Sequence, residues 1–261
     1  MPSISVQHVD VSFPIYEGAQ RSLRHIMTNA GGRIASVTHR RVVVEALKDV
    51  SFDVHRGDRL AILGHNGAGK TTLLRVLAGI YEPLRGQVAI EGRVAPLFDI
   101  SLGMDLDATG YENIRIRGLY LGMTEAEIST QIGEIAEFTE LGEFLHLPTR
   151  TYSLGMRTRL AFGVSTCITP DILLLDEGIG AVDANFVEKA DARLNALIER
   201  SGVMVLVSHS MSLLRRFCNK ALVLEHGSVV FIGSIDEAVS AYTHGHERAS
   251  EGGLTRPLSS H

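Results

Sequence analysis

Residues 59–74 read Arg-Leu-Ala-Ile-Leu-Gly-His-Asn-Gly-Ala-Gly-Lys-Thr-Thr-Leu-Leu. The apolar run at 59–63 predicts a buried strand, and a helical pattern begins at Thr72. The loop between them matches G-x-x-x-x-G-K-[ST], the pattern of a loop that binds phosphate groups. We therefore expect a nucleotide to be bound by Gly64, His65, Asn66, Gly67, Ala68, Gly69, Lys70, Thr71 and Thr72.

Each residue type in this loop has a chemical reason. Glycines let the backbone turn so that its N–H groups converge on phosphate oxygens, and the start of the helix adds partial positive charge. Lys70 would reach the β- and γ-phosphates, and the Thr71 hydroxyl would bind Mg²⁺. A glycine-rich strand-to-helix turn without a ligand is the alternative, and the full pattern argues against it.

The rest of the chain alternates short β-branched runs with longer helical patterns, which predicts an α/β core with a parallel sheet. We expect strands at residues 4–6, 42–46, 59–63, 94–98, 172–175, 203–207, 221–225 and 229–232, the last two joined by a turn at 226–228. Residues 104–167 predict an inserted helical lobe, in which Thr124 and Glu127 form a capping box. Residues 243–261 predict a disordered tail.

Composition narrows the class of protein. The 261 residues suffice for one or two domains, and the longest apolar runs fall short of the roughly 18–20 residues that span a bilayer. A formal charge of −5 argues against bulk attraction to nucleic acid. Without a visible signal peptide, Cys167 and Cys218 are expected to be reduced core thiols in the cytoplasm.

Residues 18–44 form a basic segment. It contains five arginines and no acidic residue, and Leu23, Ile26 and Met27 are spaced to share one face of a short helix. The segment is either a solvated surface loop or a surface that faces anionic lipid or a membrane partner.

Acidic and basic side chains follow two further predicted strands. Asp176 ends the run at 172–175, where a carboxylate would hold Mg²⁺ beside a phosphate loop, and Glu177 would act as general base toward the attacking water. His209 follows the run at 203–207, and parallel strands bring their carboxyl ends to one edge of the sheet. We expect His209 to bind the γ-phosphate and the attacking water; a cap on the following helix is the alternative.

The sequence Tyr152-Ser153-Leu154-Gly155-Met156 precedes a helix that we expect to begin near Arg157. The Ser153 hydroxyl and the Gly155 N–H would form a second anion-binding helix start. If the helical lobe projects outward, this helix start serves the ATP of a partner subunit.

Together these motifs resemble the nucleotide-binding subunit of ABC transporters over nearly the whole chain. The resemblance implies an ABC ATPase fold over residues 1–242, with a RecA-like P-loop NTPase core, an antiparallel β lobe and the helical lobe. It also implies a D-loop ending at Asp183, ATP and Mg²⁺ as ligands, and a dimer that sandwiches two ATP molecules. Two copies of a separate polytopic membrane subunit would complete the transporter.

Several departures from the family pattern narrow the resemblance. Leu154 and Met156 replace a glycine and a glutamine of the signature, Gly178 replaces a proline, and Asp99 stands near the place of the Q-loop glutamine as a metal ligand. These variants resemble polysaccharide and O-antigen exporter ATPases, including the teichoic-acid branch. The family's aromatic stack on adenine points to Phe13, or second to Tyr16, with a core role for Phe13 as the alternative.

The resemblance implies an ATP-hydrolysing subunit that is peripheral to the membrane, on the cytoplasmic face of the inner membrane. Its exporter would move a lipid-linked cell-envelope polysaccharide such as O-antigen, teichoic acid or galactan. It does not extend to the C-terminal carbohydrate-binding domain of some such exporters. The alternatives are a lipid or drug exporter ATPase, a soluble ABC ATPase acting on ribosomes or DNA, and a catalytically inactive clamp.

Overall fold

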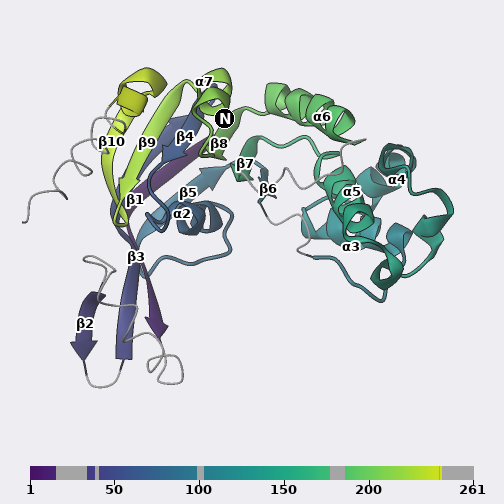
Figure 1. Ribbon diagram of the computed structural model, residues 1–261, viewed down its shortest axis with the longest axis horizontal. Helices are drawn as coiled ribbons and strands as arrows, with labels where there is room; N and C mark the ends of the chain where they lie inside the picture. Colours follow the sequence, from purple (N-terminus) through teal and green to yellow (C-terminus); the bar gives the residue numbers. More distant parts are fainter. Residues whose placement is uncertain (16–33, 39–40, 99–102, 177–185, 241, 243–261) are drawn as a thin grey trace, which may run out of the picture. The chain divides into compact units, whose positions relative to one another are not determined.

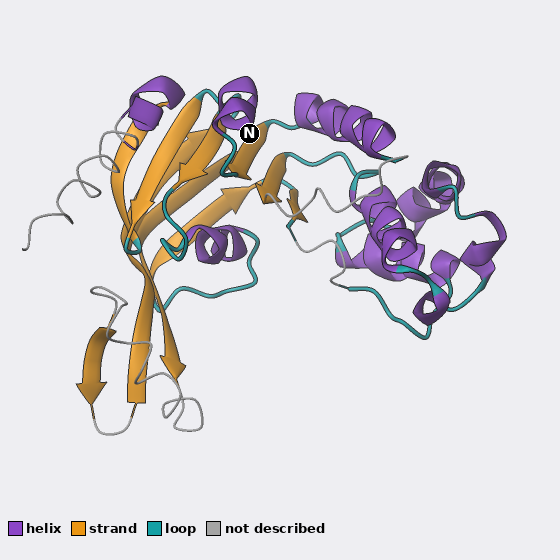
Figure 2. Ribbon diagram, viewed as in Figure 1, coloured by secondary structure: helices purple, strands orange, loops and turns teal. Residues whose placement is uncertain are grey.

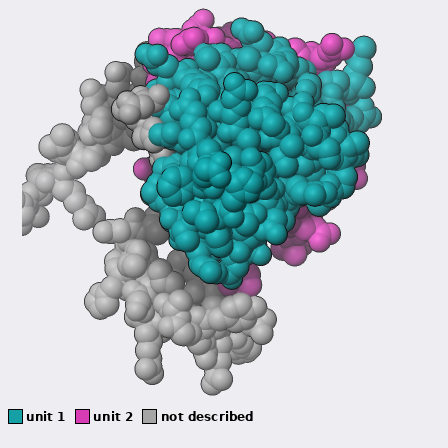
Figure 3. Space-filling model, turned by 90° about the vertical axis from the view of Figure 1, so that its right-hand side faces the viewer, with its two compact units in different colours: residues 1–2, 91–204 teal, residues 3–90, 205–261 magenta. Residues whose placement is uncertain are grey.

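A computed structural model describes residues 1–15, 34–38, 41–98, 103–176, 186–240 and 242. They fall into two compact units, which Figure 3 colours separately. Unit 1 comprises residues 1–2 and 91–204, and unit 2 comprises residues 3–90 and 205–261. Among the described helices, none combines the length and the apolar composition that crossing a bilayer requires.

Unit 2 contains an antiparallel sheet built on two long strands, β1 (Ser3–Ile15) and β3 (Arg41–His55), which pair along most of their length (Figure 1). The strand order is β2-β3-β1-β5, with β2 at Ile34–Thr38 and β5 at Arg85–Glu91. Buried aliphatic side chains alternate along β1, and Ile4 lies opposite Val54 in the register. This alternation is typical of a strand with one face in a core.

Both long strands extend well beyond the predicted runs at 4–6 and 42–46, because the ladder continues through irregularities that accommodate polar residues. His8 and Asp49 adopt left-handed backbone angles, with φ of 50° and 49°. The His8 Nδ1 lies 2.7 Å from the Asp49 Oδ1, and the Asp49 N–H donates to the Asp10 Oδ1 at 2.8 Å. Side chains thus replace the ladder contacts that the irregularity breaks.

The sequence patterns missed β2 and β5. Most residues of β5 are exposed, so it has no apolar run to reveal it. The β2 strand lies inside the basic segment 18–44, so this part of the segment is not a loop. The helix expected at Leu23, Ile26 and Met27 lies outside the described residues.

A second set of strands in unit 2 follows the order β10-β9-β4-β8. The β4 strand (Arg59–Leu63) runs parallel to β9 (Lys220–Glu225), and β10 (Ser228–Ser234) is antiparallel to β9. The turn between β9 and β10 has φ of 48° at His226 and 84° at Gly227, which confirms the predicted hairpin. The β8 strand (Val203–Val207) is buried throughout, as its uninterrupted apolar sequence predicts.

The described part of unit 2 also contains helices: α2 (Lys70–Leu77) follows the loop after β4, α7 (Met211–Phe217) follows β8, and residues 235–240 are helical after β10. The α2 helix buries Leu73, Leu74, Val76 and Leu77 on one side.

Unit 1 combines two parallel strands with most of the helices (Figure 2). The β6 strand (Val94–Leu97) pairs in parallel with β7 (Ile172–Asp176). The helices α3 (Gly110–Tyr120), α4 (Glu125–Thr139) and α5 (Leu154–Ser165) pack against one another. Short 3-10 turns occupy Gly142–His146 and Thr149–Thr151, and α6 spans Val187–Arg200.

An aromatic cluster forms part of the core of unit 1. The Phe138 ring stacks on Phe162 at 6.1 Å and meets the edge of Phe186 at 4.9 Å. The α4 helix begins with the predicted capping box, in which the Thr124 side chain accepts from the Glu127 N–H. The α/β fold class is therefore confirmed, with parallel strands and helices together in unit 1.

Candidate functional site

The loop at residues 64–71 joins β4 to α2 in a conformation that requires glycine. Gly64, Gly67 and Gly69 have φ of 150°, 80° and 112°. A Cβ at Gly64 would lie 2.4 Å from the backbone oxygen of Leu224, and one at Gly69 would lie 2.7 Å from that of Ala46. The loop therefore passes against β9 and β3 at a distance that only glycine permits.

Lys70 occupies the interior of this loop. Its side chain is 7% exposed, and its Nζ donates to the backbone oxygens of Gly64 at 2.6 Å and His65 at 3.1 Å. The loop backbone is closed further by a bond from the Ala68 N–H to the His65 oxygen at 3.0 Å. The protein thus holds the ammonium group against backbone oxygens of the loop.

The start of α2 completes the loop. Gly69 occupies the position before the helix in a left-handed conformation, and the helix start has no side-chain cap. Uncapped N–H groups at a helix start attract anions. Thr71 is exposed and Thr72 is half-buried in this first turn. A polyphosphate fits this loop, because the glycines, the Lys70 ammonium and the start of α2 all offer groups that attract anions.

His209 follows β8 in unit 2, and its side chain is exposed. Ser210, not His209, caps α7, because its Oγ accepts from the Leu213 N–H at 3.5 Å. The Oγ of buried Ser208 accepts from the Ser210 N–H at 3.0 Å. The alternative in which His209 caps the following helix is therefore wrong.

Phe13 lies on β1 and is 36% exposed, so the alternative of a core phenylalanine is wrong. Its ring meets Tyr81 edge to face, with centroids 5.2 Å apart. Arg75 fixes Tyr81, because its Nη1 donates to the Tyr81 hydroxyl at 3.0 Å. Tyr81 was missed in the sequence, since nothing in its spacing links it to Phe13. Tyr16 lies outside the described residues.

In unit 1, Asp176 is the half-buried last residue of a strand that is otherwise buried. The neighbouring strand β6 ends at Leu97, which pairs with Leu175, one residue before Asp176. Carboxylate and hydroxyl oxygens are ligands that Mg²⁺ prefers, so the chemistry of Asp176 and Thr71 fits this ion. Asp99, Glu177 and Asp183 lie outside the described residues.

The signature segment, residues 152–156, leads into α5. The helix begins at Leu154, three residues before the expected start at Arg157, because Ser153 is its cap: the Ser153 Oγ accepts from the Met156 N–H at 3.2 Å. Ser153 is exposed and Gly155 is half-buried. The hydroxyl and the glycine therefore both belong to an accessible helix start with no acidic residue in its first turn.

The predicted site residues are thus distributed over both units. The phosphate loop, Phe13 and His209 belong to unit 2, whereas Asp176, Ser153 and Gly155 belong to unit 1. Elsewhere, Cys167 and Cys218 are free thiols, as expected. Burial raises their pKa values to about 11 and about 12, so neither is a thiolate at neutral pH.

The sequence pattern of the ABC transporter family matches residues 47–180. The O-antigen export system ATP-binding protein RfbE of Yersinia enterocolitica is 46% identical over 231 residues, which cover 88% of this chain and 97% of that protein. The teichoic acids export ATP-binding protein TagH of Listeria monocytogenes serotype 4b is 33% identical over 92% of this chain and 69% of that protein. These relatives confirm the resemblance to polysaccharide exporter ATPases.

A solved structure of an ATP binding subunit of an ABC transporter has a TM-score of 0.66 and 21% identity, and covers 92% of this chain and 93% of that one. This likeness confirms the expected ABC ATPase fold. Because the family pattern includes the phosphate loop and the RfbE likeness runs over most of both proteins, the chain belongs to the ABC transporter family.

Proposed function

We propose that this chain is the ATP-hydrolysing subunit of an exporter that moves a lipid-linked cell-envelope polysaccharide across the cytoplasmic membrane. The cradle that holds the Lys70 ammonium among the backbone oxygens of a glycine loop is the observation that carries ATP binding. The export role and the O-antigen or teichoic-acid type of cargo are supported by the names of the relatives. The protein would work peripherally with two copies of a polytopic membrane subunit.

The chemistry is transfer of the γ-phosphoryl group of ATP to water. Lys70 binds the β- and γ-phosphates, and the loop N–H groups surround them together with Thr72. Thr71 and Asp176, with Asp99 as a further oxygen ligand, would hold Mg²⁺, which would supply positive charge against the charge that develops on the phosphates. Glu177 accepts a proton from the attacking water, which His209 orients toward the γ-phosphate.

The catalytic unit is an ATP-sandwich dimer of two copies of residues 1–242, whose helical lobe spans residues 104–167. In it, Ser153, Gly155 and Asp183 of one copy bind the nucleotide held by the loop of the other. An exposed helix start with a serine cap has the chemistry this contact needs. Phe13, or Tyr16, stacks on adenine; the partial exposure of Phe13 supports the first.

Trapping the dimer tests this function. Tagged Glu177→Gln protein in its native cells, given ATP and released in mild detergent, should retain ATP and co-purify with one polytopic membrane protein in equal amount by mass spectrometry. Cells expressing it should accumulate lipid-linked glycan on the cytoplasmic side. Co-purification of ribosomes or DNA would instead indicate a soluble ABC ATPase, and accumulation of another lipid would indicate a different exporter.

A further inference from the structure

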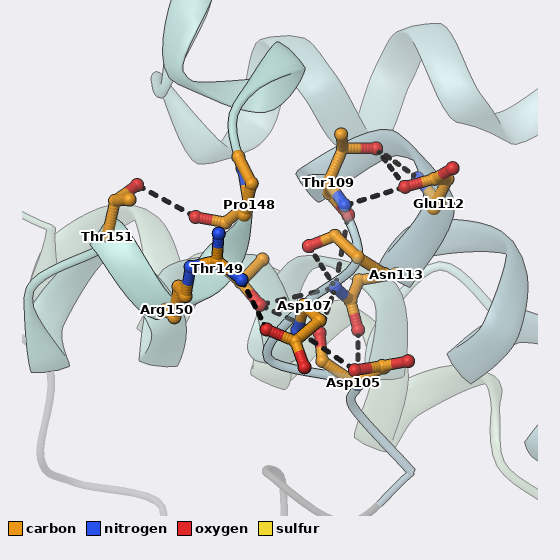
Figure 4. Close-up of polar contacts among 10 residues, drawn as sticks. Asp105, Asp107, Thr109, Glu112, Asn113, Pro148, Thr149, Arg150 and Thr151 are labelled. Carbon is orange, nitrogen blue, oxygen red and sulfur yellow. Dashed lines mark hydrogen bonds and ion pairs between the residues drawn. The ribbon is translucent and has the colours of Figure 1, made fainter.

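Asn113, on the first turn of α3, is a buried polar side chain whose amide oxygen and amide nitrogen both have hydrogen-bond partners. It is 1% exposed, and its Oδ1 accepts from the Asp105 N–H at 2.7 Å. Its Nδ2, which carries two hydrogens, lies within hydrogen-bond distance of four acceptors: the backbone oxygens of Asp105 at 2.7 Å, Thr109 at 3.0 Å and Ala108 at 3.2 Å, and the Thr149 Oγ1 at 3.3 Å (Figure 4). One amide therefore joins the loop before α3 to a residue 36 positions further along the chain.

Thr149 also makes hydrogen bonds of its own to the loop before α3. It is fully buried, its Oγ1 donates to the Asp105 oxygen at 2.9 Å, and its N–H donates to the Ala108 oxygen at 2.9 Å. The Arg150 N–H donates to the Leu106 oxygen at 2.8 Å. An isolated antiparallel bridge between Thr109 and Pro148 and an ion pair between Arg150 and Asp107 extend the junction (Figure 4).

This junction ends immediately before the signature segment. Tyr152 is 4% exposed, and its hydroxyl donates to the Phe144 oxygen at 2.5 Å. It also lies against the start of α3, where a Cβ on Gly110 would be 2.5 Å from the Tyr152 hydroxyl oxygen. The next residue is Ser153, which caps α5. Because both Thr149 and Tyr152 are buried and hydrogen-bonded, the backbone between Thr149 and Ser153 has little freedom to move.

A buried polar network of this kind specifies a geometry more than it adds stability. Each hydrogen bond contributes modestly on balance, but leaving one partner buried and unsatisfied is costly, so the network tolerates one arrangement only. Apolar side chains already pack α3, α4 and α5 together, with Ile114, Ile128 and Ile135 almost fully buried. The network therefore adds to this packing a set of polar contacts that hold the residues immediately before α5.

We propose that Asn113 and Thr149 are positioning residues that hold the signature segment in the geometry needed to bind ATP on the second copy. This inference rests on the proposed function, since it assumes that Ser153 and Gly155 contact ATP across the dimer. Contacts made across two copies depend on exact placement, and a displacement of about 1 Å can cost roughly a hundredfold in rate. Neither residue touches ATP itself.

The test removes the Thr149 hydroxyl and keeps its shape. Thr149→Val, placed in the Glu177→Gln background, is compared with Thr139→Val, which removes a buried hydroxyl from the same unit. The Thr139 Oγ1 donates only within its own helix, to the Ala136 oxygen at 2.9 Å, among the contacts the structure describes, and Thr139 is fully buried. Thermal unfolding, ATP affinity of the monomer and ATP-dependent dimerisation by analytical ultracentrifugation are measured for both.

We expect both variants to unfold at lower temperature and to bind ATP as monomers with unchanged affinity. Only Thr149→Val should weaken dimerisation, by about tenfold to a hundredfold. In the chain with Glu177 intact, Thr149→Val should lower kcat by a similar factor, and Thr149→Ser should restore both quantities. Thr149→Ala serves in the same comparison if the valine does not fit.

Equal dimerisation by the Thr149 and Thr139 variants would overturn the inference and leave the proposed function standing. If Glu177→Gln with an intact network forms no ATP-dependent dimer, the ATP sandwich itself is wrong, and the positioning role falls with it. The two failures are thus distinguishable.

Discussion

At the scale of single residues, the phosphate loop depends on close approach. Gly64 lets the backbone pass close to the carbonyl of Leu224. In this conformation Lys70 donates to the backbone oxygens of Gly64 and His65. An anion that enters the loop meets this ammonium and gains a charge-assisted hydrogen bond, which the surrounding protein strengthens.

Lys70→Ala should weaken ATP binding by about tenfold to a hundredfold, because charge-assisted hydrogen bonds contribute roughly 1.5–3 kcal/mol. Isothermal titration calorimetry with ATP measures the change. Lys48→Ala, which removes an exposed lysine on β3 of the same unit, is the matched control and should leave the affinity unaltered. Equal affinities in all three proteins would remove Lys70 from the site.

Gly64→Ala should both destabilise the protein and reduce ATP binding. Gly57→Ala is the control, since Gly57 also has a positive φ, of 92°, but nothing lies within 4 Å of its added Cβ. We expect Gly57→Ala to lower the free energy of unfolding by about 1 kcal/mol through backbone strain. Gly64→Ala should lose about 1–3 kcal/mol more through the clash with β9, as denaturant titration would reveal.

At the scale of elements, two helices of unit 1 begin with the same reciprocal device. At the start of α3, the Thr109 side chain accepts from the Glu112 N–H and the Glu112 side chain accepts from the Thr109 N–H. Thr124 and Glu127 make the same pair of contacts at the start of α4. The spacing S/T-x-x-E is visible in the sequence in both places, and the structure adds that the carboxylates accept from backbone N–H groups at 2.7 and 2.6 Å. Each helix start is therefore determined by four consecutive residues.

The capping box of α4 predicts a pH dependence. Hydrogen bonds from the N–H and hydroxyl of Thr124, and then from Arg93, hold the pKa of Glu127 below its ordinary value of 4.5. The ionised carboxylate therefore stabilises the folded state above about pH 4.5, and this contribution is lost as pH falls through the lowered pKa.

Glu127→Gln should consequently be less stable than the parent at pH 7, and the difference should shrink as the solution is acidified toward pH 3. Urea unfolding across this pH range gives the comparison. Glu199→Gln, which changes an exposed carboxylate near the end of α6, should show no such trend. A difference that stays constant with pH would contradict the capping role.

At the scale of the whole molecule, charge is unevenly distributed along the chain. The net charge is −5, yet residues 18–44 carry five arginines and no acid. Part of this segment pairs with β3 as β2. Arginines near an anionic leaflet gain about 1 kcal/mol each, so a cluster of them can draw an otherwise acidic protein to a membrane.

Replacing Arg21, Arg24 and Arg33 with glutamine should therefore weaken binding to vesicles that contain phosphatidylglycerol, by up to roughly a hundredfold at low salt. Sedimentation with vesicles measures the bound fraction. The control replaces three exposed basic residues elsewhere in unit 2, namely Lys48, Arg56 and Arg85. If both sets of substitutions weakened vesicle binding, net charge alone would explain the effect. If neither did, the segment would not be a lipid-binding surface, and a solvated surface segment would be the remaining interpretation.

Much of the fold was predictable where residues close in sequence are sufficient. The phosphate loop, the hairpin at His226 and the cap at Thr124 each follow from a few consecutive residues. The buried strands at 59–63 and 203–207 were predicted with the bounds that the structure gives them. In all of these, backbone geometry is set by glycine, a side-chain cap or an apolar run, which act over one or two turns of chain.

Other features required the tertiary structure. The full length of β1 and β3 depends on side chains that meet across the ladder, such as His8 with Asp49. The contact of Phe13 with Tyr81 and the bond between Asn113 and Thr149 join residues 68 and 36 positions apart. No local pattern encodes such pairs, because the partners meet only after strands and helices have packed and excluded water, when each buried polar group must find its own partner.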